Sequence, residues 1–408
     1  MLMKKLATLL FILLSLHSLS QYKNDNVAFK TVFTSDLCDS LAKYPDRLIL
    51  DVRSAAEFNE KGEPGKSRPD MGRFKNAINI DVRELDNKLT QIEGFKNKTV
   101  FVICSHSQRS RRASALLAKN GFENIINING GMTSLHQLTR QGNECIYNQI
   151  ITTVKYDLIS SGEFCKAMTS SFPPLILDVR MDTVDRLSMV ILKSFGNFKN
   201  TVHIPINELA DRINEIPSGR KIIITDISGN ETSRAADLLV SKNFTNIAVL
   251  SGGVEQFIVS DPKLVTCKNE LYIPSVPFRI IGSEEMNDLF STLKDPLFLD
   301  IRNKDEFNNK AKDNSRNIGH ILNATNIPFD DLSFQMSMLD RYKNKPVIIY
   351  GFSQGREVYA AAQTLSEQGF KNIYVLSRGL FNLRWTAHNL QGYQSLSKMI
   401  IDVPEENL

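Results

Sequence analysis

The chain has 408 residues, of which 42% are hydrophobic and 23% are charged, and 49 basic against 45 acidic residues give a formal net charge of +4. These values are typical of a soluble globular protein of about two to four domains. The basic residues are interleaved with acidic ones and form no Lys/Arg block, which excludes the charge pattern of a nucleic-acid-binding protein.

The first residues of the chain are typical of an export signal. Lys4 and Lys5 precede an apolar run over 6–16, and small residues around Ser20 suit cleavage. The run is short for a membrane span, which needs about 20 residues. We therefore predict a signal peptide over 1–20 and an exported mature protein, periplasmic or secreted, with no membrane span after cleavage. An uncleaved anchor is the alternative.

Three segments of the chain repeat one pattern of short apolar strands and helical segments. Each copy opens with an apolar strand that ends in Asp-x-Arg, and the three aspartates, Asp51, Asp178 and Asp300, are 127 and 122 residues apart. A period of this length indicates one domain per repeat rather than a solenoid of short units. Each copy closes on a further strand and a turn that contains glycine, namely Gly130-Gly131, Gly252-Gly253 and Arg378-Gly379.

The strands are continuous apolar stretches that alternate with helical segments. Strands of this kind are buried on both faces, as in parallel sheets, and their alternation with helices is typical of the α/β class. We therefore predict three tandem α/β domains, each with a mostly parallel central sheet flanked by helices. The predicted boundaries are 21–146, 147–273 and 274–408. Ligands of such sheets bind outside the carboxyl ends of the strands.

One cysteine, Cys104, directly follows the apolar strand over 100–103 and opens a short polar loop that ends at Arg109. A helix is predicted from Arg111 to Lys119. The backbone N–H groups of such a loop, the helix N-terminus and the arginine all favour negative charge. They would lower the pKa of a thiol and activate it as a nucleophile. Cys104 is therefore the candidate catalytic residue, and neither a metal nor a cofactor is expected.

Four motifs in chain order resemble the rhodanese-like sulfurtransferase family: the Asp-Val-Arg strand end at 51–53, the strand at 77–80, the Cys-x4-Arg-Ser loop at 104–110 and the Gly-Gly turn. The whole exported chain resembles three tandem rhodanese-like domains. The resemblance implies that Cys104 takes a sulfane sulfur from a small anionic donor, thiosulfate or a persulfide, and holds it as a persulfide. A thiophilic acceptor, a thiol or cyanide, would then remove the sulfur.

The rest of this loop is the candidate substrate-binding site. It consists of Ser105, His106, Ser107, Gln108, Arg109 and Ser110. By resemblance, Arg109 is the loop arginine of the family, and Ser107 stands where many members have glycine. His106 is interpreted as a solvent-facing residue in preference to one that orients substrate. The related phosphatases have a Cys-x5-Arg loop that encircles phosphate, and the shorter loop here favours sulfur transfer over dephosphorylation.

The second and third copies lack the cysteine. In the second copy Asp226 replaces the cysteine and Glu231 replaces the arginine; in the third, Gly351 replaces the cysteine and Arg356 is retained. Neither copy can form a persulfide there, so only the first domain is predicted to be catalytic. Around Asp226 and Glu231 we expect a solvated acidic loop in preference to a metal site. Domains 2 and 3 could recruit a protein partner, and a sulfur carrier or a binding scaffold is the alternative to an enzyme.

The four other cysteines form no CxxC pair and have no metal-ligand spacing. Five cysteines leave at least one thiol unpaired in an oxidising compartment, and a chain of this length can fold without disulfides. We expect most of these four to be small core or loop residues. They are Cys38, Cys145, Cys165 and Cys267.

Asp51 and Arg53 have the appearance of an acid–base pair. The same pair recurs in both copies that lack the cysteine. This recurrence favours a structural role, as an ion pair that anchors the turn at the end of the strand.

Overall fold

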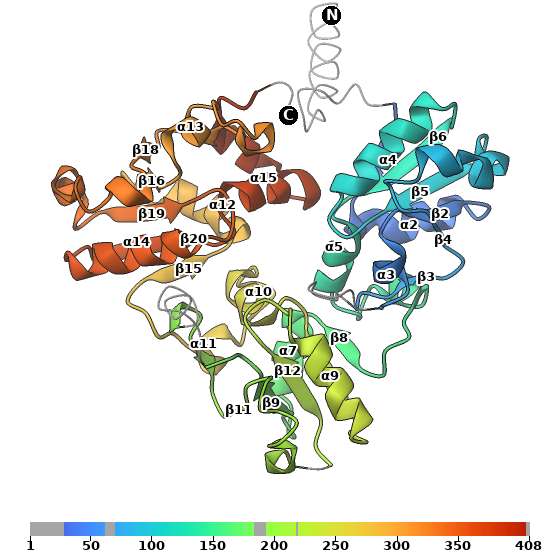
Figure 1. The fold of residues 1–408 in the computed structure, drawn as a ribbon, viewed down its shortest axis with the longest axis horizontal. Coiled ribbons are helices and arrows are strands. Elements are labelled where there is room, and N and C mark those ends of the chain that lie inside the picture. The colour runs from blue at the N-terminus through green and yellow to red at the C-terminus, as the bar shows by residue number, and fades with distance from the viewer. Residues whose placement is uncertain (1–27, 62–69, 183–192, 218, 405–408) are drawn as a thin grey trace, which may run out of the picture.

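The computed structural model describes residues 28–61, 70–182, 193–217 and 219–404. The predicted export signal over 1–20 lies outside these residues. Within the described part of the chain, no helix is long and apolar enough to cross a membrane. Three α/β units of similar build lie around a common centre, in chain order from the blue unit to the red one (Figure 1).

The first unit is built on a five-stranded sheet in which every strand pair is parallel. The order across the sheet is β1-β6-β5-β2-β4, with β1 Lys30–Val32, β2 Leu48–Asp51, β4 Ile78–Asn79, β5 Thr99–Ile103 and β6 Asn124–Ile128. Its helices are α2 Leu37–Lys43, α3 Ala55–Phe58, α4 Gln108–Lys119, α5 Gly131–Gln137 and α6 Glu144–Tyr147. The strand β5 is buried on both faces: Val100 and Val102 pack into one hydrophobic cluster, Phe101 and Ile103 into another.

The second and third units repeat this parallel sheet. The second has the order β11-β9-β12-β13-β8, with β8 Asp157–Ile159, β9 Leu175–Asp178, β11 Thr201–His203, β12 Ile222–Thr225 and β13 Ile247–Leu250. The third has the order β15-β20-β19-β16-β18, with β15 Arg279–Ile281, β16 Leu297–Asp300, β18 Thr325–Asn326, β19 Pro346–Tyr350 and β20 Asn372–Leu376. Three parallel sheets of one topology, flanked by helices, confirm the predicted fold class and the threefold repeat.

The helices of these two units follow the same plan. In the second unit they are α7 Ser161–Met168, α9 Thr232–Ser241, α10 Gly253–Val259 and α11 Lys268–Leu271. In the third they are α12 Ser283–Thr292, α13 Lys304–Phe307, α14 Arg356–Glu367 and α15 Gly379–Asn389, followed by the 3-10 helix η7 Gln394–Met399.

Each unit also closes with a short antiparallel strand pair. The pairs are β3 (Arg73–Phe74) with β7 (Ile150–Ile151), β10 (Asn197–Phe198) with β14 (Tyr272–Ile273), and β17 (His320–Ile321) with β21 (Ile400–Ile401). The boundary predicted after Ile146 is therefore early, because β7 belongs to the first unit. The sequence signal there was the repeat alone, since no proline marks that linker.

The three units form a closed ring, in which the helix after the glycine-containing turn meets the next unit. The backbone N–H of Arg140, just beyond α5, donates to Glu163 of the second unit at 3.1 Å. The Tyr393 hydroxyl of the third unit donates to Asp261, which follows α10, at 3.1 Å. Asn129 of the first unit donates to the carbonyl of His388, at the end of α15, at 2.5 Å. The helices α5, α10 and α15 accordingly lie on the inner sides of their units (Figure 1).

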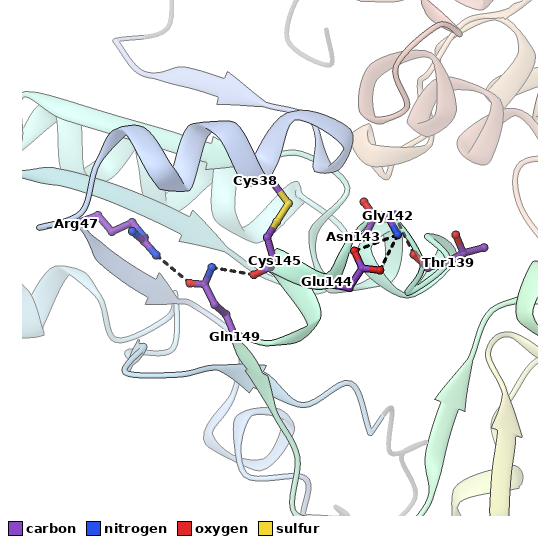
Figure 2. The surroundings of a disulfide bond; sticks show 8 residues. All are labelled: Cys38, Arg47, Thr139, Gly142, Asn143, Glu144, Cys145 and Gln149. Atoms are coloured by element: carbon purple, nitrogen blue, oxygen red, sulfur yellow. Dashed lines mark hydrogen bonds between the residues drawn. A yellow bond between two sulfur atoms is a disulfide. The ribbon is translucent and has the colours of Figure 1, made fainter.

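Two disulfides occupy equivalent positions in the first two units. Cys38 of α2 pairs with Cys145 of α6, and Cys165 of α7 pairs with Cys267 just before α11. The expectation of small core or loop residues holds for the location of Cys165 and Cys267, which lie in a hydrophobic cluster, but all four cysteines are paired, which the expectation did not include. Figure 2 shows the first bridge, beside which Gln149 donates to the Cys145 carbonyl at 3.0 Å.

The third unit has a hydrogen bond where the other two have a disulfide. Asn287 lies six residues after β15, and Ser395 lies five residues before β21. In the other two units, the two cysteines of the disulfide have these same spacings from the equivalent strands. The Ser395 hydroxyl donates to Asn287 Oδ1 at 2.6 Å. The same two elements are thus joined in all three units, covalently in two of them.

Candidate active site

Cys104 is the first residue after β5, at the carboxyl edge of the first sheet. Its thiol is the free one among the five cysteines, and only 1% of the residue is exposed. Helix α4 begins at Gln108, three residues earlier than predicted, so Arg109 and Ser110 lie in its first turn. The first N–H groups of a helix have no partner inside it. The N-terminal end of α4 therefore lies next to Cys104, which contacts Ser110 of this turn.

The chain reverses at Ser107, which has a φ of 80°. This left-handed conformation is unfavourable for a residue with a Cβ atom. The Ser107 hydroxyl donates to Asn129 Oδ1 at 2.8 Å and so helps to hold the turn. Ser107 thus adopts the conformation that a glycine would adopt more readily at this position.

The start of α5 holds the loop from the other side. The N–H of Met132 donates to the Cys104 carbonyl at 2.9 Å, and that of Thr133 donates to the Ser105 carbonyl at 3.0 Å. A Cβ atom on Gly131 would lie 2.2 Å from the Cys104 carbonyl oxygen. The Gly-Gly turn is therefore required by the close approach of this backbone to the cysteine.

A buried polar network supports the loop from below. Ser110 Oγ lies 3.5 Å from Cys104 Sγ and donates to Asn127 Oδ1 at 2.6 Å. Asn127 Nδ2 donates in turn to Asn129 Oδ1 at 3.2 Å. All of these side chains are buried, so the loop and the end of β6 form one rigid arrangement.

Asn127 was missed at the level of sequence, although the repeat carried a signal. The last but one residue of the equivalent strand is Asn127 in β6, Val249 in β13 and Val375 in β20. The other two copies have valine at this position, so the strand can pack without a polar side chain there. A buried amide in the first copy therefore indicates a role other than packing. It occurs in the copy that has the cysteine.

Glu57 is a second functional residue that was missed. Arg109 donates to both of its carboxylate oxygens, at 2.6 and 2.7 Å, and Ser105 Oγ donates to it at 2.8 Å. Burial raises the pKa of Glu57, but the hydrogen bonds and charge of Arg109 outweigh it and bring the pKa to about 2. The positive charge of Arg109 is thus balanced by the carboxylate of Glu57. Arg109 Nη2 also donates to Ser105 Oγ at 2.9 Å and holds Ser105 in place.

Glu57 also has a local structural role, which explains its presence in the sequence without reference to the site. With Ser54 it forms a capping box at the start of α3: the Glu57 N–H donates to Ser54 Oγ at 3.2 Å, and the Ser54 N–H donates to Glu57 at 3.0 Å. The Ser-x-x-Glu pattern indicates a helix start. The pattern does not indicate that the glutamate pairs with an arginine about 50 residues further along the chain.

The equivalent loop of the second domain contains its own anion. Asp226 takes the place of Cys104, and its carboxylate accepts the N–H groups of Gly229 and Glu231, the latter at 2.7 Å. Gly229 has a φ of 87°, close to that of Ser107 at the same loop position. The predicted solvated acidic loop is wrong for Asp226, which is buried and fills the centre of the loop. Burial raises its pKa, and the two N–H groups act in the opposite direction.

The loop of the third domain has no side chain at the position of the cysteine. Gly351 takes the place of Cys104, and Gln354, at the place of Ser107, donates to Glu255 of the second domain at 3.0 Å. Glu255 also accepts the Ser377 hydroxyl at 2.6 Å. This loop therefore takes part in the contact between domains 2 and 3.

The third domain covers the cysteine loop of the first. Trp385 of α15 donates through Nε1 to the His106 carbonyl at 2.8 Å. His106 is exposed at the surface. Its pKa is lowered by desolvation of the imidazole by the surrounding protein and by the positive charges of Arg109 and Arg378. Gln108, the first residue of α4, is also exposed. Residues of the first and third domains thus meet at the outer side of the loop.

Asp51 and Arg53 form a buried ion pair at the end of β2. Arg53 Nη2 lies 2.7 Å from Asp51 Oδ2 and donates to the Gly72 carbonyl at 2.8 Å. The equivalent pair in the third domain, Asp300 and Arg302, has a distance of 2.6 Å. The pair therefore joins the strand end to the neighbouring turn, in domains with and without the cysteine.

The fold and the site together define an α/β protein with one buried, free thiol at the carboxyl edge of a parallel sheet, next to the N-terminal end of a helix. The rhodanese-like domain family matches residues 35–138, 162–259 and 283–384, which together make up more than half of the chain. The chain belongs to this family, with three domains in tandem.

Similar proteins share segments of this chain. A tRNA uridine(34) hydroxylase from Cytophaga hutchinsonii is 33% identical over 90 residues, which are 21% of this chain and 25% of that protein. The protein of that name from Pelagibacter ubique is 29% identical over 123 residues, 28% of this chain and 36% of that protein. The chain thus spans about a quarter to a third of the length of these relatives.

Solved structures of the family are similar at lower identity. A thiosulfate sulfurtransferase from Pseudomonas aeruginosa is 14% identical, with 93% of this chain and 71% of that chain covered and a TM-score of 0.21. A rhodanese with anions from E. coli is 24% identical, with 22% of this chain and 89% of that chain covered and a TM-score of 0.18.

Proposed function

We propose that the protein is a sulfurtransferase that carries out its chemistry at Cys104. The observation that carries this proposal is the free, buried Cys104 thiol in a loop whose counterpart in domain 2 binds a carboxylate by backbone N–H groups. A loop with this geometry stabilises an anion at the position of the cysteine sulfur. The state to be stabilised is a thiolate and, after sulfur uptake, a persulfide.

The proposed reaction has two steps. The Cys104 thiolate attacks the sulfane sulfur of thiosulfate or of a persulfide; a new S–S bond forms, and sulfite or a thiolate leaves with the electron pair. An acceptor thiolate or cyanide then attacks the outer sulfur, and the Cys104 thiolate leaves. Because the residue is 1% exposed, the donor must be small enough to reach the sulfur through the loop mouth.

Arg109 has a different role in this proposal from the one first assigned to it. Its guanidinium is paired with Glu57 and holds Ser105, so it is a positioning residue. The anion is bound by backbone N–H groups and the N-terminal end of α4.

A small anionic donor suits this chain better than a nucleic acid. The curated relatives are named for an activity on tRNA, but they share only the matched segment. The 49 basic residues are balanced by 45 acidic ones, whereas nucleic-acid binding needs a concentrated basic surface.

We further propose that the protein works in an oxidising compartment, periplasmic or extracellular. Two disulfides support this, because such bonds persist where glutathione does not reduce them. The apolar run over 6–16 is in keeping with export. The burial of Cys104 would protect the one remaining thiol from mixed disulfides.

The test is steady-state turnover with thiosulfate as donor and cyanide as acceptor. We expect formation of thiocyanate by the full-length protein and none by Cys104→Ser. Stable sulfur loading without turnover would instead support the carrier alternative. The double variant Cys165→Ser with Cys267→Ser is the control, since it removes two other sulfur atoms without freeing a second thiol, and the folded protein should keep its turnover.

A further inference from the structure

A cavity of about 420 Å³ lies where the three domains meet. Its wall includes the end of α5, the end of α10 with the segment that follows it, and the turn after α15. A volume in this range is typical of sites for small organic molecules. The catalytic loop from Cys104 to Ser110 does not contribute to this wall.

The charged groups of the wall are acidic. Asp261 and Glu284 line the cavity, and no lysine or arginine is among its described lining residues. The two nearby cations are bonded to neutral groups of the wall: Lys268 Nζ donates to the Ser260 carbonyl at 3.2 Å, and Arg378 donates to Gln256 Oε1 at 2.8 Å. Among the described residues, neither of these two carboxyl groups forms an ion pair with a lysine or an arginine.

The environment of Glu284 makes its negative charge costly. Burial raises its pKa most, and the neighbouring Asp261 raises it further, while Arg378 and Lys268 act in the opposite direction. A cation in the cavity would relieve the repulsion between these carboxylates.

Two buried polar groups of the wall lack hydrogen-bond partners among the described residues. Ser134, which is 2% exposed, lines the cavity, and its Oγ has no hydrogen-bond partner among the described residues. His136 donates through Nε2 to the Met71 carbonyl at 2.8 Å, so its Nδ1 is an acceptor. That Nδ1 is buried and unpartnered as well. The wall thus offers acceptors and calls for a ligand that donates hydrogen bonds.

The remaining surface of the cavity suits an apolar body. Leu138, Leu264 and Leu390 contribute to the wall. Leu264 is 62% exposed, although it is a large apolar side chain. Exposed apolar surface beside a cavity that has a few convergent polar groups is a mark of a ligand site.

We propose that the junction of the three domains is a binding site for a small organic cation, an amine carried on an apolar body. The ammonium group would lie between Asp261 and Glu284 and donate to them. The apolar body would pack against the leucines. Because all three domains form the wall, the ligand would also hold the ring together, and this proposal is independent of sulfur transfer at Cys104.

The probe is benzylamine, titrated into the full-length protein and followed by calorimetry. Benzyl alcohol and benzoate have the same ring with a neutral and a negative head. We expect benzylamine to bind and to raise the midpoint of thermal unfolding, with both analogues at least about tenfold weaker, the effect of a charge-assisted bond.

The matched variants separate a site from a general charge effect. Glu284→Gln should weaken benzylamine binding about tenfold. Asp288→Asn removes one charge from an exposed position of the same helix and should leave binding unchanged. Asp261→Asn serves if Glu284→Gln does not fold. The proposal is overturned if benzylamine does not bind, if benzoate or benzyl alcohol binds as tightly, or if the two variants of α12 behave alike.

Discussion

Ser107 and Gly229 occupy the same position in two copies of one loop, and both adopt a left-handed backbone, with φ of 80° and 87°. The loop geometry is thus retained in a domain that has kept the cysteine and in one that has lost it. In domain 2 the loop surrounds the Asp226 carboxylate. In domain 1 the equivalent place holds the Cys104 sulfur.

Ser107→Gly should be tolerated. Glycine relieves the backbone strain, about 1 kcal/mol, and loses the hydroxyl bond to Asn129, which is worth about as much. The free energy of unfolding, measured in urea, should stay within about 1 kcal/mol of the wild type, with sulfur transfer retained. Ser107→Val keeps the strain and loses the bond, so it should cost at least about 2 kcal/mol and most of the activity. Equal stabilities of the two variants would contradict the assigned backbone strain.

Glu57→Gln should change the pH dependence of stability. The folded-state pKa of Glu57 is about 2, below its ordinary value of 4.5. Its charged form therefore contributes stability that is present above about pH 4.5 and lost as the pH falls toward 2. The variant should be less stable than the wild type at neutral pH, and urea unfolding should show the difference shrinking on acidification. Glu84→Gln, at an exposed pair with Lys88, is the control. A difference that does not depend on pH would argue against the Arg109–Glu57 pair.

Asn127→Val tests whether the buried amide serves the site or the fold. Valine occupies this position in the other two domains, so the strand should form. The free energy of unfolding should change by no more than about 2 kcal/mol. Ser110 would keep its bond to the Ser107 carbonyl. Turnover should fall about tenfold, because the loop loses its link to β6. Asn124→Val, the same change at an exposed residue of β6, should leave turnover as it is.

Trp385→Phe removes the Nε1 donor and keeps an aromatic ring in α15. Losing one hydrogen bond to the His106 carbonyl should loosen the loop and lower turnover about threefold or more. The rate of Cys104 alkylation by iodoacetamide should rise, since the mouth of the site opens. Thermal unfolding should be little changed, because Asn129 and Gly130 still contact the end of α15. An unchanged alkylation rate would mean that domain 3 does not shape access to the sulfur.

The fold could be predicted from the sequence, and Cys104 could be singled out as the candidate nucleophile, because both have local signals. The three Asp-x-Arg strand ends and the continuous apolar strands predict parallel sheets, and Cys104 stands directly after one such strand. The start of α4 was placed late because polar residues of a loop and of a first helical turn look alike in sequence. Asp226 was misjudged because its burial follows from the shape of the loop.

The partners of the loop could not be found in this way. Glu57 and Trp385 reach the loop from helices α3 and α15, and the second of these lies in another domain. The disulfides likewise join α2 to α6 and α7 to the start of α11, more than 100 residues apart. Such contacts depend on how the domains fold and pack, which spacing alone does not give.

The central claim is that sulfur chemistry is available in one domain of the three. Its most direct test is the mass of the intact protein after incubation with thiosulfate and removal of excess donor, followed by peptide mapping. The wild type should gain the mass of one sulfur atom, located on Cys104, and Cys104→Ser should gain none. A sulfur adduct on Cys104→Ser, or on a residue of domain 2 or 3 in the wild type, would contradict the claim.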